Sequence, residues 1–191
     1  MDGIMYLTLV KGAPQDLGAR LDKEKRTYRF LDSLGVEYYT VDNPPADTME
    51  DCARIEQVLG APICKNLFLC NRQRTLFYLL MIPSDKVFKT KDISAQINSS
   101  RLSFAPGEDM EELLDITPGS LSVLGLMNDR DKGVSLLIDR ELLSCAEIGV
   151  HPCVNTSCVR LKTDDIINRI VPATDHTFTV VDLPTYSEQD Q

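Results

Sequence analysis

Two apolar runs in the middle of the chain constrain its fold more than any other feature. Residues 63–70 and 75–82 are largely apolar, and only the polar residues 71–74 lie between them. Each run has the length of a strand rather than a helix, and a short polar connection between two such runs is typical of a hairpin. We therefore predict a hairpin of buried strands at the centre of a sheet.

The rest of the chain mixes helical and strand patterns around this hairpin. Apolar residues at helical spacing predict helices at residues 23–34, after a cap at Thr48, at residues 91–97 and 108–114, after a cap at Asp139, and around Ile166. Strand patterns occupy residues 36–41, 134–138, 155–161 and 177–183. Because hairpins and crossover helices are mixed, we predict a mixed α+β fold, a layered α/β sheet wrapped by helices.

The length of 191 residues fits one compact domain. We expect an arm of uncertain order at residues 1–21, a folded domain at residues 22–184 and a polar tail at residues 185–191. No apolar run reaches the roughly 18–20 residues of a membrane-spanning helix, and the first residues do not resemble a signal peptide. We therefore expect a cytoplasmic protein with no membrane partner. The spacing of the six cysteines in a chain of this length predicts no disulfide framework.

The net charge of −9 limits the contacts that this chain can make with nucleic acids. Broad binding to phosphate backbones draws its affinity from many lysine and arginine contacts. The charge therefore argues against a DNA-binding protein, and any contact with RNA has to be local.

Lys65 is the only cation in the first apolar run. Strand alternation places it on the face of Leu67 and Leu69, where an unpaired ammonium group is costly. Two interpretations stay open. Lys65 either flanks a strand that begins at Asn66 and is exposed, as most lysines are, or holds an anion at the rim of the strand.

His151 is the second candidate, because it precedes Pro152 and is therefore held in extended geometry within a turn. Its ring changes protonation near neutral pH, which suits acid–base work or a hydrogen bond to a reacting carbonyl. The alternative is an ordinary turn histidine. His176, at the start of the last predicted strand, is interpreted as structural and without polar partners.

Metal and thiol chemistry find less support in the sequence. His151, Cys153 and Cys158 lack the paired spacing that is usual for tetrahedral zinc. Cys153 stands two residues from His151, which allows a thiol nucleophile without establishing one. The turn at Gly119 can present backbone N–H groups to a ligand, but the chain has no phosphate-binding loop, dinucleotide fingerprint or serine-nucleophile elbow. We therefore expect no metal and no cofactor.

Five short motifs, taken in order, resemble one family. They are KNLFL at residues 65–69, RLSFA at residues 101–105, TPGSLS at residues 117–122, GVHP at residues 149–152 and NT at residues 155–156. Together with the turn at residues 43–45 and the helix predicted after it, their content, order and separation are similar to the YbaK/ProX family. The resemblance covers residues 23–183.

The resemblance implies a compact mixed sheet wrapped by helices, and an aminoacyl-tRNA deacylase. Such an enzyme hydrolyses the ester between a wrong amino acid and the terminal adenosine of a tRNA, without a metal ion. The similarity to freestanding editors that remove alanine makes alanyl-tRNA(Pro) the expected substrate and cysteinyl-tRNA(Pro) the competitor. The implied partners are the acceptor end of tRNA(Pro) and prolyl-tRNA synthetase. A non-catalytic tRNA- or synthetase-binding module of the same fold is the alternative.

The resemblance also implies roles for individual residues. Lys65 would hold the phosphate or ribose of the acceptor end, and His151 would orient the ester or the water. Substrate-binding roles fall to Asn66, Arg101, Ser103, Gly119, Ser120, Asn155 and Thr156. Lys65 and Arg101, with Arg72 and Arg74, are expected to form a local basic patch. Val123 stands where the family commonly has proline, which affects the rigidity of the pocket loop.

Overall fold

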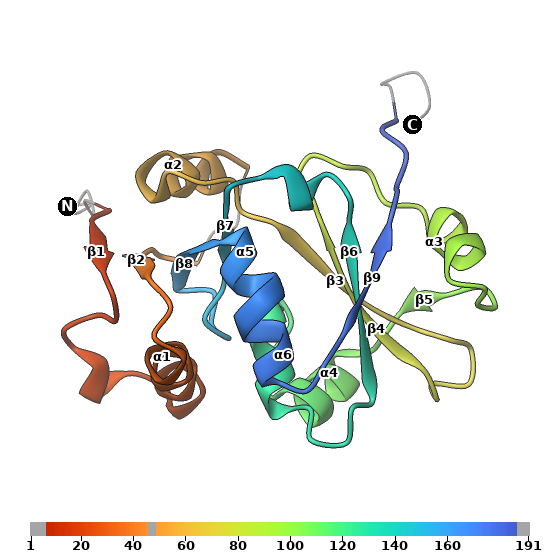
Figure 1. Ribbon diagram of the computed structural model, residues 1–191, viewed down its shortest axis with the longest axis horizontal. Helices are drawn as coiled ribbons and strands as arrows, with labels where there is room; N and C mark the ends of the chain where they lie inside the picture. The colour runs from red at the N-terminus through yellow and green to blue at the C-terminus, as the bar shows by residue number, and fades with distance from the viewer. Residues whose placement is uncertain (1–6, 46–48, 187–191) are drawn as a thin grey trace.

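A computed structural model of the chain describes residues 7–45 and 49–186. Two sheets lie side by side, one in each half of the molecule, with helices packed around them (Figure 1). One sheet has the strand order β5-β3-β4-β6-β9, and the other has the order β1-β2-β8-β7. The predicted mixed α+β fold is confirmed.

The predicted hairpin forms the centre of the larger sheet. β3 (Lys65–Cys70) and β4 (Phe77–Ile82) pair antiparallel, with Lys65 opposite Ile82 and Cys70 opposite Phe77. The connecting turn therefore lies at the far end of β3 from Lys65. β5 (Ser103–Phe104) pairs antiparallel with that far end.

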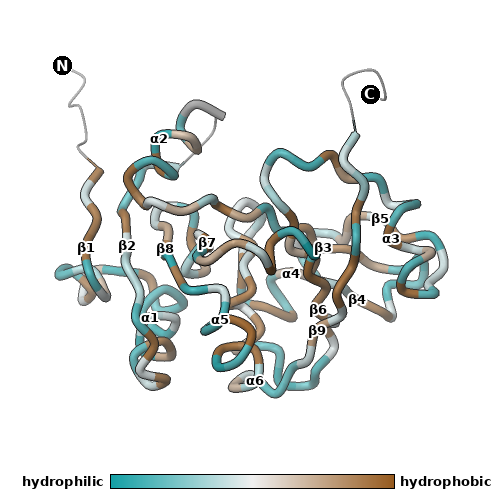
Figure 2. The backbone as a smooth tube through the Cα atoms, turned by 45° about the horizontal axis from the view of Figure 1, so that its top comes forward, coloured by the Kyte–Doolittle hydropathy of each residue, from teal (hydrophilic) through white to brown (hydrophobic). Residues whose placement is uncertain are grey.

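Burial on both faces explains why β4 is a continuous apolar run. Leu79 and Met81 belong to the large core cluster, whereas Leu80 and Ile82 belong to a second cluster that includes Ile93 of α3 (Thr90–Gln96). Hydrophobic segments accordingly run along β3, β4 and β6 (Figure 2). A strand buried on both faces needs apolar residues at successive positions.

Two parallel strands extend the sheet on the other side of β4. β6 (Val134–Asp139) pairs with β4, and β9 (Phe178–Val181) pairs with β6. Parallel neighbours end at the same edge of a sheet. The segments that follow β4, β6 and β9 therefore lie close together.

The smaller sheet is antiparallel throughout and contains β1 (Leu9–Lys11), β2 (Tyr38–Asp42), β8 (Ser157–Lys162) and β7 (Glu147–Val150). Gly149 of β7 joins it to the larger sheet. Its N–H donates to the carbonyl of Pro62 at 2.8 Å, and its carbonyl accepts from the N–H of Cys64 at 3.1 Å. This junction brings the start of β3 beside the end of β7.

Helices cover the two sheets. α1 (Asp22–Leu34) buries Tyr28 and Leu31 and ends at Gly35, whose φ of 61° is left-handed. α2 (Met49–Leu59) and α4 (Gly107–Leu114) follow the predicted positions. α5 (Thr163–Asp165), a π-helical stretch (Ile166–Ile170) and α6 (Val171–Ala173) are continuous along the chain. No helix in the described ranges is long and apolar enough to cross a membrane.

The helix predicted after Asp139 was wrong. The chain forms a 3₁₀ turn at Leu142–Ser144 and then enters β7. Asp139 does accept a hydrogen bond from the N–H of Glu141 at 2.9 Å, as a helix cap would. Residues 147–150 nevertheless pair with β8, which satisfies their backbone groups and buries Ile148 and Val150.

The arm predicted at residues 1–21 is partly structured, because β1 pairs with β2 and Arg20 binds Asp42 at 2.6 Å. Residues 1–6, the cap predicted at Thr48 and residues 187–191 of the predicted tail lie outside the described residues. His176 is buried, yet it does have polar partners. Its Nε2 lies 3.0 Å from Asp129 Oδ2, and its Nδ1 lies 2.8 Å from the Thr174 carbonyl.

Candidate functional site

A cavity of about 510 Å³ opens where the two sheets meet. Four of the predicted site residues line it: Lys65, Asn66, Gly119 and His151. They come from the start of β3, the turn after α4 and the segment after β7. The walls are largely apolar and are contributed by residues that include Ala53, Ile63, Leu67, Phe68, Met110 and Leu121. The cavity therefore combines an apolar enclosure with a few polar groups, as ligand sites do.

Lys65 is the first paired residue of β3 and is half-buried, so the alternative of an exposed lysine that only flanks the strand is wrong. Its Nζ donates to the carbonyl of Lys86 at 2.6 Å. Burial lowers the pKa of the Lys65 ammonium, and nearby Asp85 partly opposes this effect. Lys65 thus places one cation at the rim of the cavity.

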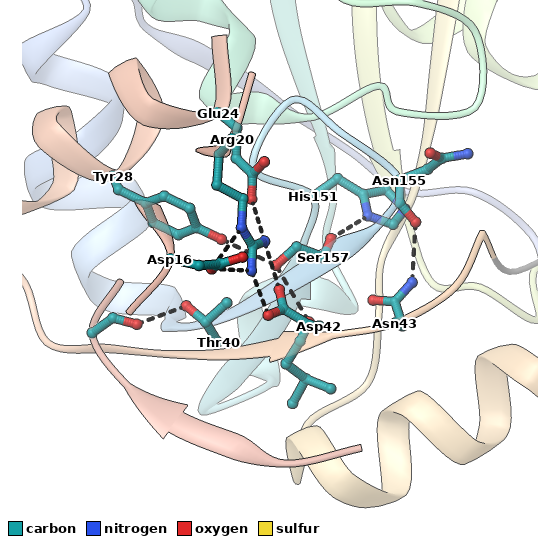
Figure 3. Close-up of polar contacts among 12 residues, drawn as sticks. Asp16, Arg20, Glu24, Tyr28, Thr40, Asp42, Asn43, His151, Asn155 and Ser157 are labelled. Atoms are coloured by element: carbon teal, nitrogen blue, oxygen red, sulfur yellow. Dashed lines mark hydrogen bonds and ion pairs between the residues drawn. The ribbon is translucent and has the colours of Figure 1, made fainter. Parts of the chain in front are cut away.

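His151 lies close to the loop that leads into β8. Its Nδ1 is 3.0 Å from the carbonyl oxygen of Ser157 (Figure 3). A carbonyl can only accept, so Nδ1 carries the proton and Nε2 of the neutral ring is an acceptor. Burial lowers the pKa of His151, and the Ser157 hydrogen bond opposes the shift. The ring is therefore neutral at pH 7, with Nε2 unprotonated.

Asn43 holds the loop that follows His151. This buried side chain donates from Nδ2 to the Asn155 carbonyl at 3.0 Å (Figure 3). The backbone N–H of Asn43 donates to the Thr156 carbonyl at 3.1 Å. Asn43 was predicted only as part of a turn. The polar residue at the end of a predicted strand, just before Pro44, was the available signal.

A buried polar network supports the same loop from behind. Ser157 Oγ donates to the Val41 carbonyl at 3.3 Å and lies 3.0 Å from the hydroxyl of Tyr28. Next to Tyr28 along α1, Glu24 pairs with Arg20 at 2.8 Å (Figure 3). Because the hydroxyls of Tyr28 and Ser157 both have a partner in this network, the segment that carries His151 is fixed by α1 and β2.

The remaining predicted site residues do not line the cavity. Asn155 comes nearest, since a Cβ on Gly119 would lie 3.8 Å from Asn155 Nδ2. Thr156 is exposed and contributes its carbonyl to Asn43. Ser120 is buried in the turn, where its N–H donates to the Thr117 carbonyl at 3.1 Å. Ser103 is exposed at the far end of β3.

Arg101 lines a second hollow, of about 880 Å³, instead of the cavity. This hollow also contains Phe88, Lys89 and Lys91, and none of its lining residues is acidic. Phe104 is 62% exposed and lines both the hollow and the cavity, so the two adjoin. Phe104 was not among the predicted site residues, although it stands within the RLSFA motif.

The single basic patch expected from Lys65, Arg101, Arg72 and Arg74 does not form. Arg72 and Arg74 lie in the β3–β4 turn, at the opposite end of β3 from Lys65. Arg74 is engaged by Asp109 at 2.5 Å and by Glu108 at 2.8 Å. The strand register therefore divides these cations between separate places.

The thiols near the site are held in their protonated form. Burial raises the pKa of Cys64 and Cys158 to about 12, and that of Cys153 to about 11. Cys153 lies in the core, with its Sγ 3.4 Å from Thr27 Oγ1, so a Cys153–His151 nucleophile is wrong. In the described ranges, no group of three His, Cys, Asp or Glu side chains has the geometry to hold a metal ion.

The structure is therefore a mixed α+β domain whose largely apolar cavity is lined by a lysine and a neutral histidine, as in proteins that bind a small ligand. Residues 43–168 match the family model of the aminoacyl-tRNA editing domain. The chain therefore belongs to the aminoacyl-tRNA editing domain family. The predicted family and the predicted enzyme class, an aminoacyl-tRNA deacylase, are confirmed.

Individual relatives agree with this assignment. The chain is 29% identical to the prolyl-tRNA editing protein ProX of Acetoanaerobium sticklandii, over 85% of this chain and 99% of that protein. It is 27% identical to the prolyl-tRNA synthetase associated domain-containing protein 1 of Danio rerio, over 83% and 86% of the two chains. A solved structure described as a candidate trans-editing enzyme for prolyl-tRNA synthetase has the same fold. Its TM-score is 0.64 at 14% identity, and the match covers 87% of this chain and 100% of that one.

Proposed function

We propose that this chain is a freestanding editing hydrolase that removes alanine from mischarged tRNA(Pro) without a metal ion. The observation that carries the proposal is that the Lys65 ammonium group and His151 line the same cavity. Nε2 of His151 has no hydrogen-bond partner in the described part of the chain. The names of two relatives, a prolyl-tRNA editing protein and a prolyl-tRNA synthetase associated protein, support the proline system.

In the proposed reaction, water adds to the ester carbonyl and the bond from that carbon to the ribose oxygen breaks. The ribose oxygen takes up a proton, and the free amino acid and the tRNA leave. Nε2 of His151 accepts a hydrogen bond from the water or from the adjacent ribose hydroxyl, and so orients it. Lys65 holds the phosphate or ribose of the terminal adenosine, and the Gly119 turn offers backbone donors to the aminoacyl group.

Selection of the amino acid rests on the size of the apolar enclosure. A difference of one methylene group is worth only about 1–3 kcal/mol in a single pocket, which is why editing needs a second site. Val123, which stands where the family commonly has proline, is fully buried and does not line the cavity. Ser122 caps the 3₁₀ helix Val123–Asn128, because its Oγ accepts from the N–H of Leu124 at 3.2 Å. This cap supplies rigidity that proline would otherwise give.

The second hollow is the surface that binds the acceptor end of the tRNA in this proposal. Lys91 and Arg101 are exposed and make no ion pair within the described ranges, and Phe104 offers an exposed ring on which a base can stack. A short cationic, aromatic surface of this kind reconciles tRNA binding with a net charge of −9. Prolyl-tRNA synthetase is the proposed protein partner.

The substrate assignment is tested by incubating the protein with alanyl-, cysteinyl- and prolyl-tRNA, all built on tRNA(Pro), and by following loss of the ester. We expect alanine to be released fastest, with prolyl-tRNA hydrolysed about 10- to 200-fold more slowly. Faster release of cysteine would assign cysteine as the substrate instead. Binding of all three tRNAs with only the spontaneous rate of ester loss would identify a non-catalytic module and contradict the proposal.

A further inference from the structure

We propose that the buried ion pair between Lys86 and Asp139 positions Lys65 for the reaction, an inference that rests on the proposed function. The connection between the pair and the cavity is a single contact. Lys65 Nζ donates to the backbone carbonyl of Lys86 at 2.6 Å. The place of the Lys65 ammonium group therefore depends on where the chain holds that carbonyl.

Lys86 is fixed at both ends of its side chain. Its backbone N–H donates to the Pro83 carbonyl at 3.2 Å and closes the turn that follows β4. Its Nζ lies 2.9 and 3.0 Å from the two carboxylate oxygens of Asp139, and 3.1 Å from Glu141. The side chains of Lys86 and Asp139 are only 5% and 0% exposed. The pair is thus shielded from water and from salt.

Asp139 also ties together the segments that follow three neighbouring strands. It is the last residue of β6, which lies between β4 and β9 (Figure 1). Its carboxylate accepts from the N–H of Glu141 at 2.9 Å and from the N–H of Leu183, after β9, at 3.1 Å. Through Lys86 it also holds the turn after β4. This carboxylate therefore fixes the edge of the sheet at which the Lys86 carbonyl accepts the hydrogen bond from Lys65.

Stability alone does not account well for such a pair. The cost of removing two charges from water consumes much of their attraction, and neutral replacements of buried pairs often leave stability unchanged. A half-buried lysine at the cavity rim, in contrast, needs an acceptor at a fixed place. Without the Lys86 carbonyl, the long Lys65 side chain would be free to leave the cavity for water. Lys86 and Asp139 are therefore positioning residues that act through Lys65.

The test is a kinetic cycle on the full chain with alanyl-tRNA(Pro). The variant Lys86→Met, Asp139→Asn removes both charges and keeps an acceptor for the neighbouring amides. We expect kcat/KM to fall about tenfold, a size usual for residues in one hydrogen-bond network. In a Lys65→Ala background, the same change should lower kcat/KM by less than about twofold, because the group that it positions is gone. Lys86→Arg, which can still pair with Asp139, should restore most of the activity.

The matched control is the buried pair of His176 and Asp129, which lies near the start of β6, where Asp129 accepts from the N–H of Val134. His176→Gln, Asp129→Asn removes a pair whose side chains are 4% and 2% exposed and whose carboxylate also accepts from two backbone amides. We expect this change to leave kcat/KM within about twofold. Thermal unfolding of each variant reports whether it is folded. If Lys86→Met, Asp139→Asn does not fold, Lys86→Met alone, which leaves Asp139 with the N–H donors of Glu141 and Leu183, decides the question in the same cycle.

The outcomes separate this inference from the proposed function. Unchanged kcat/KM in the folded variant, or an equal loss with and without Lys65, would overturn the positioning role while the wild type still deacylates. A wild type that leaves alanyl-tRNA(Pro) intact would overturn the proposed function, and this inference with it.

Discussion

At the scale of single residues, the proposed chemistry of the cavity rests on two side chains that line it. The Ser157 carbonyl sets the tautomer of His151, and burial keeps the ring neutral, so Nε2 is available as an acceptor. Lys65 adds a cation to the cavity lining, and its Nζ donates to the Lys86 carbonyl. The thiols of Cys64 and Cys158 lie nearby but are protonated, so they take no part as nucleophiles.

The pH dependence of hydrolysis follows from the neutral ring. Burial lowers the pKa of His151 from its ordinary value of 6.5, so the acceptor on Nε2 is lost only as the pH falls below that value. We expect kcat/KM for alanyl-tRNA(Pro) to be level just above pH 6.5 and to decline at lower pH. The measurement is a pH–rate profile corrected for spontaneous ester loss. His151→Asn should remove the acid decline, and a decline centred well above pH 6.5 would contradict the assignment.

At the scale of elements, the site depends on how closely β7 approaches the start of β3. Gly149 allows this approach, because a Cβ there would lie 2.6 Å from Leu59 Cδ2 and 2.9 Å from Ile63 Cγ1. Its two backbone hydrogen bonds to Pro62 and Cys64 join the sheets. His151 follows two residues later, so the same contact that joins the sheets also sets the wall of the cavity.

Gly149→Ala tests this junction. We expect the free energy of unfolding to fall by about 1–3 kcal/mol, because the side chains of Leu59 and Ile63 must shift to make room for the added methyl group. Deacylation should fall as well, since the His151 segment shifts. The control is Gly18→Ala, where nothing lies within 4 Å and a small gain or no change is expected. Urea unfolding measures the free energy of unfolding of both variants. Equal values would show that the junction accommodates the added methyl group without strain.

Local sequence patterns predicted the elements whose burial leaves a clear pattern of apolar residues. The hairpin of β3 and β4 was confirmed because both faces of β4 are buried, which leaves a continuous apolar run in the sequence. β7 was mistaken for a helix because Asp139 does act as a cap and Leu142 and Leu143 fit a helical face. Only pairing with β8, later in the chain, decides that residues 147–150 are a strand.

Part of the candidate site was also predictable from the sequence. The sequence motifs pointed to Lys65, Asn66, Gly119 and His151, and all four line one cavity. Their catalytic and binding roles stay predictions. The carbonyl of Lys86 was not predictable, because a backbone atom has no signature in the sequence and its place depends on a distant carboxylate.

At the scale of the whole molecule, the two sheets bring distant segments of the chain to one opening. The cavity lies at their junction, and the hollow with Lys91 and Arg101 adjoins it across Phe104. Other cations are engaged elsewhere, as Arg74 is with Asp109 and Arg20 is with Asp42. An acidic protein can therefore keep a small cationic surface for the end of a tRNA.

The most direct test of the central claim is the rate of alanyl-tRNA(Pro) deacylation by the wild type, Lys65→Ala, His151→Asn and the control Lys162→Ala. Lys162 is exposed at the far end of β8 from the site. We predict that kcat/KM falls at least about 100-fold in the Lys65 and His151 variants and is unchanged in the control. Full deacylation by both Lys65→Ala and His151→Asn would show that this cavity is not where the ester is hydrolysed.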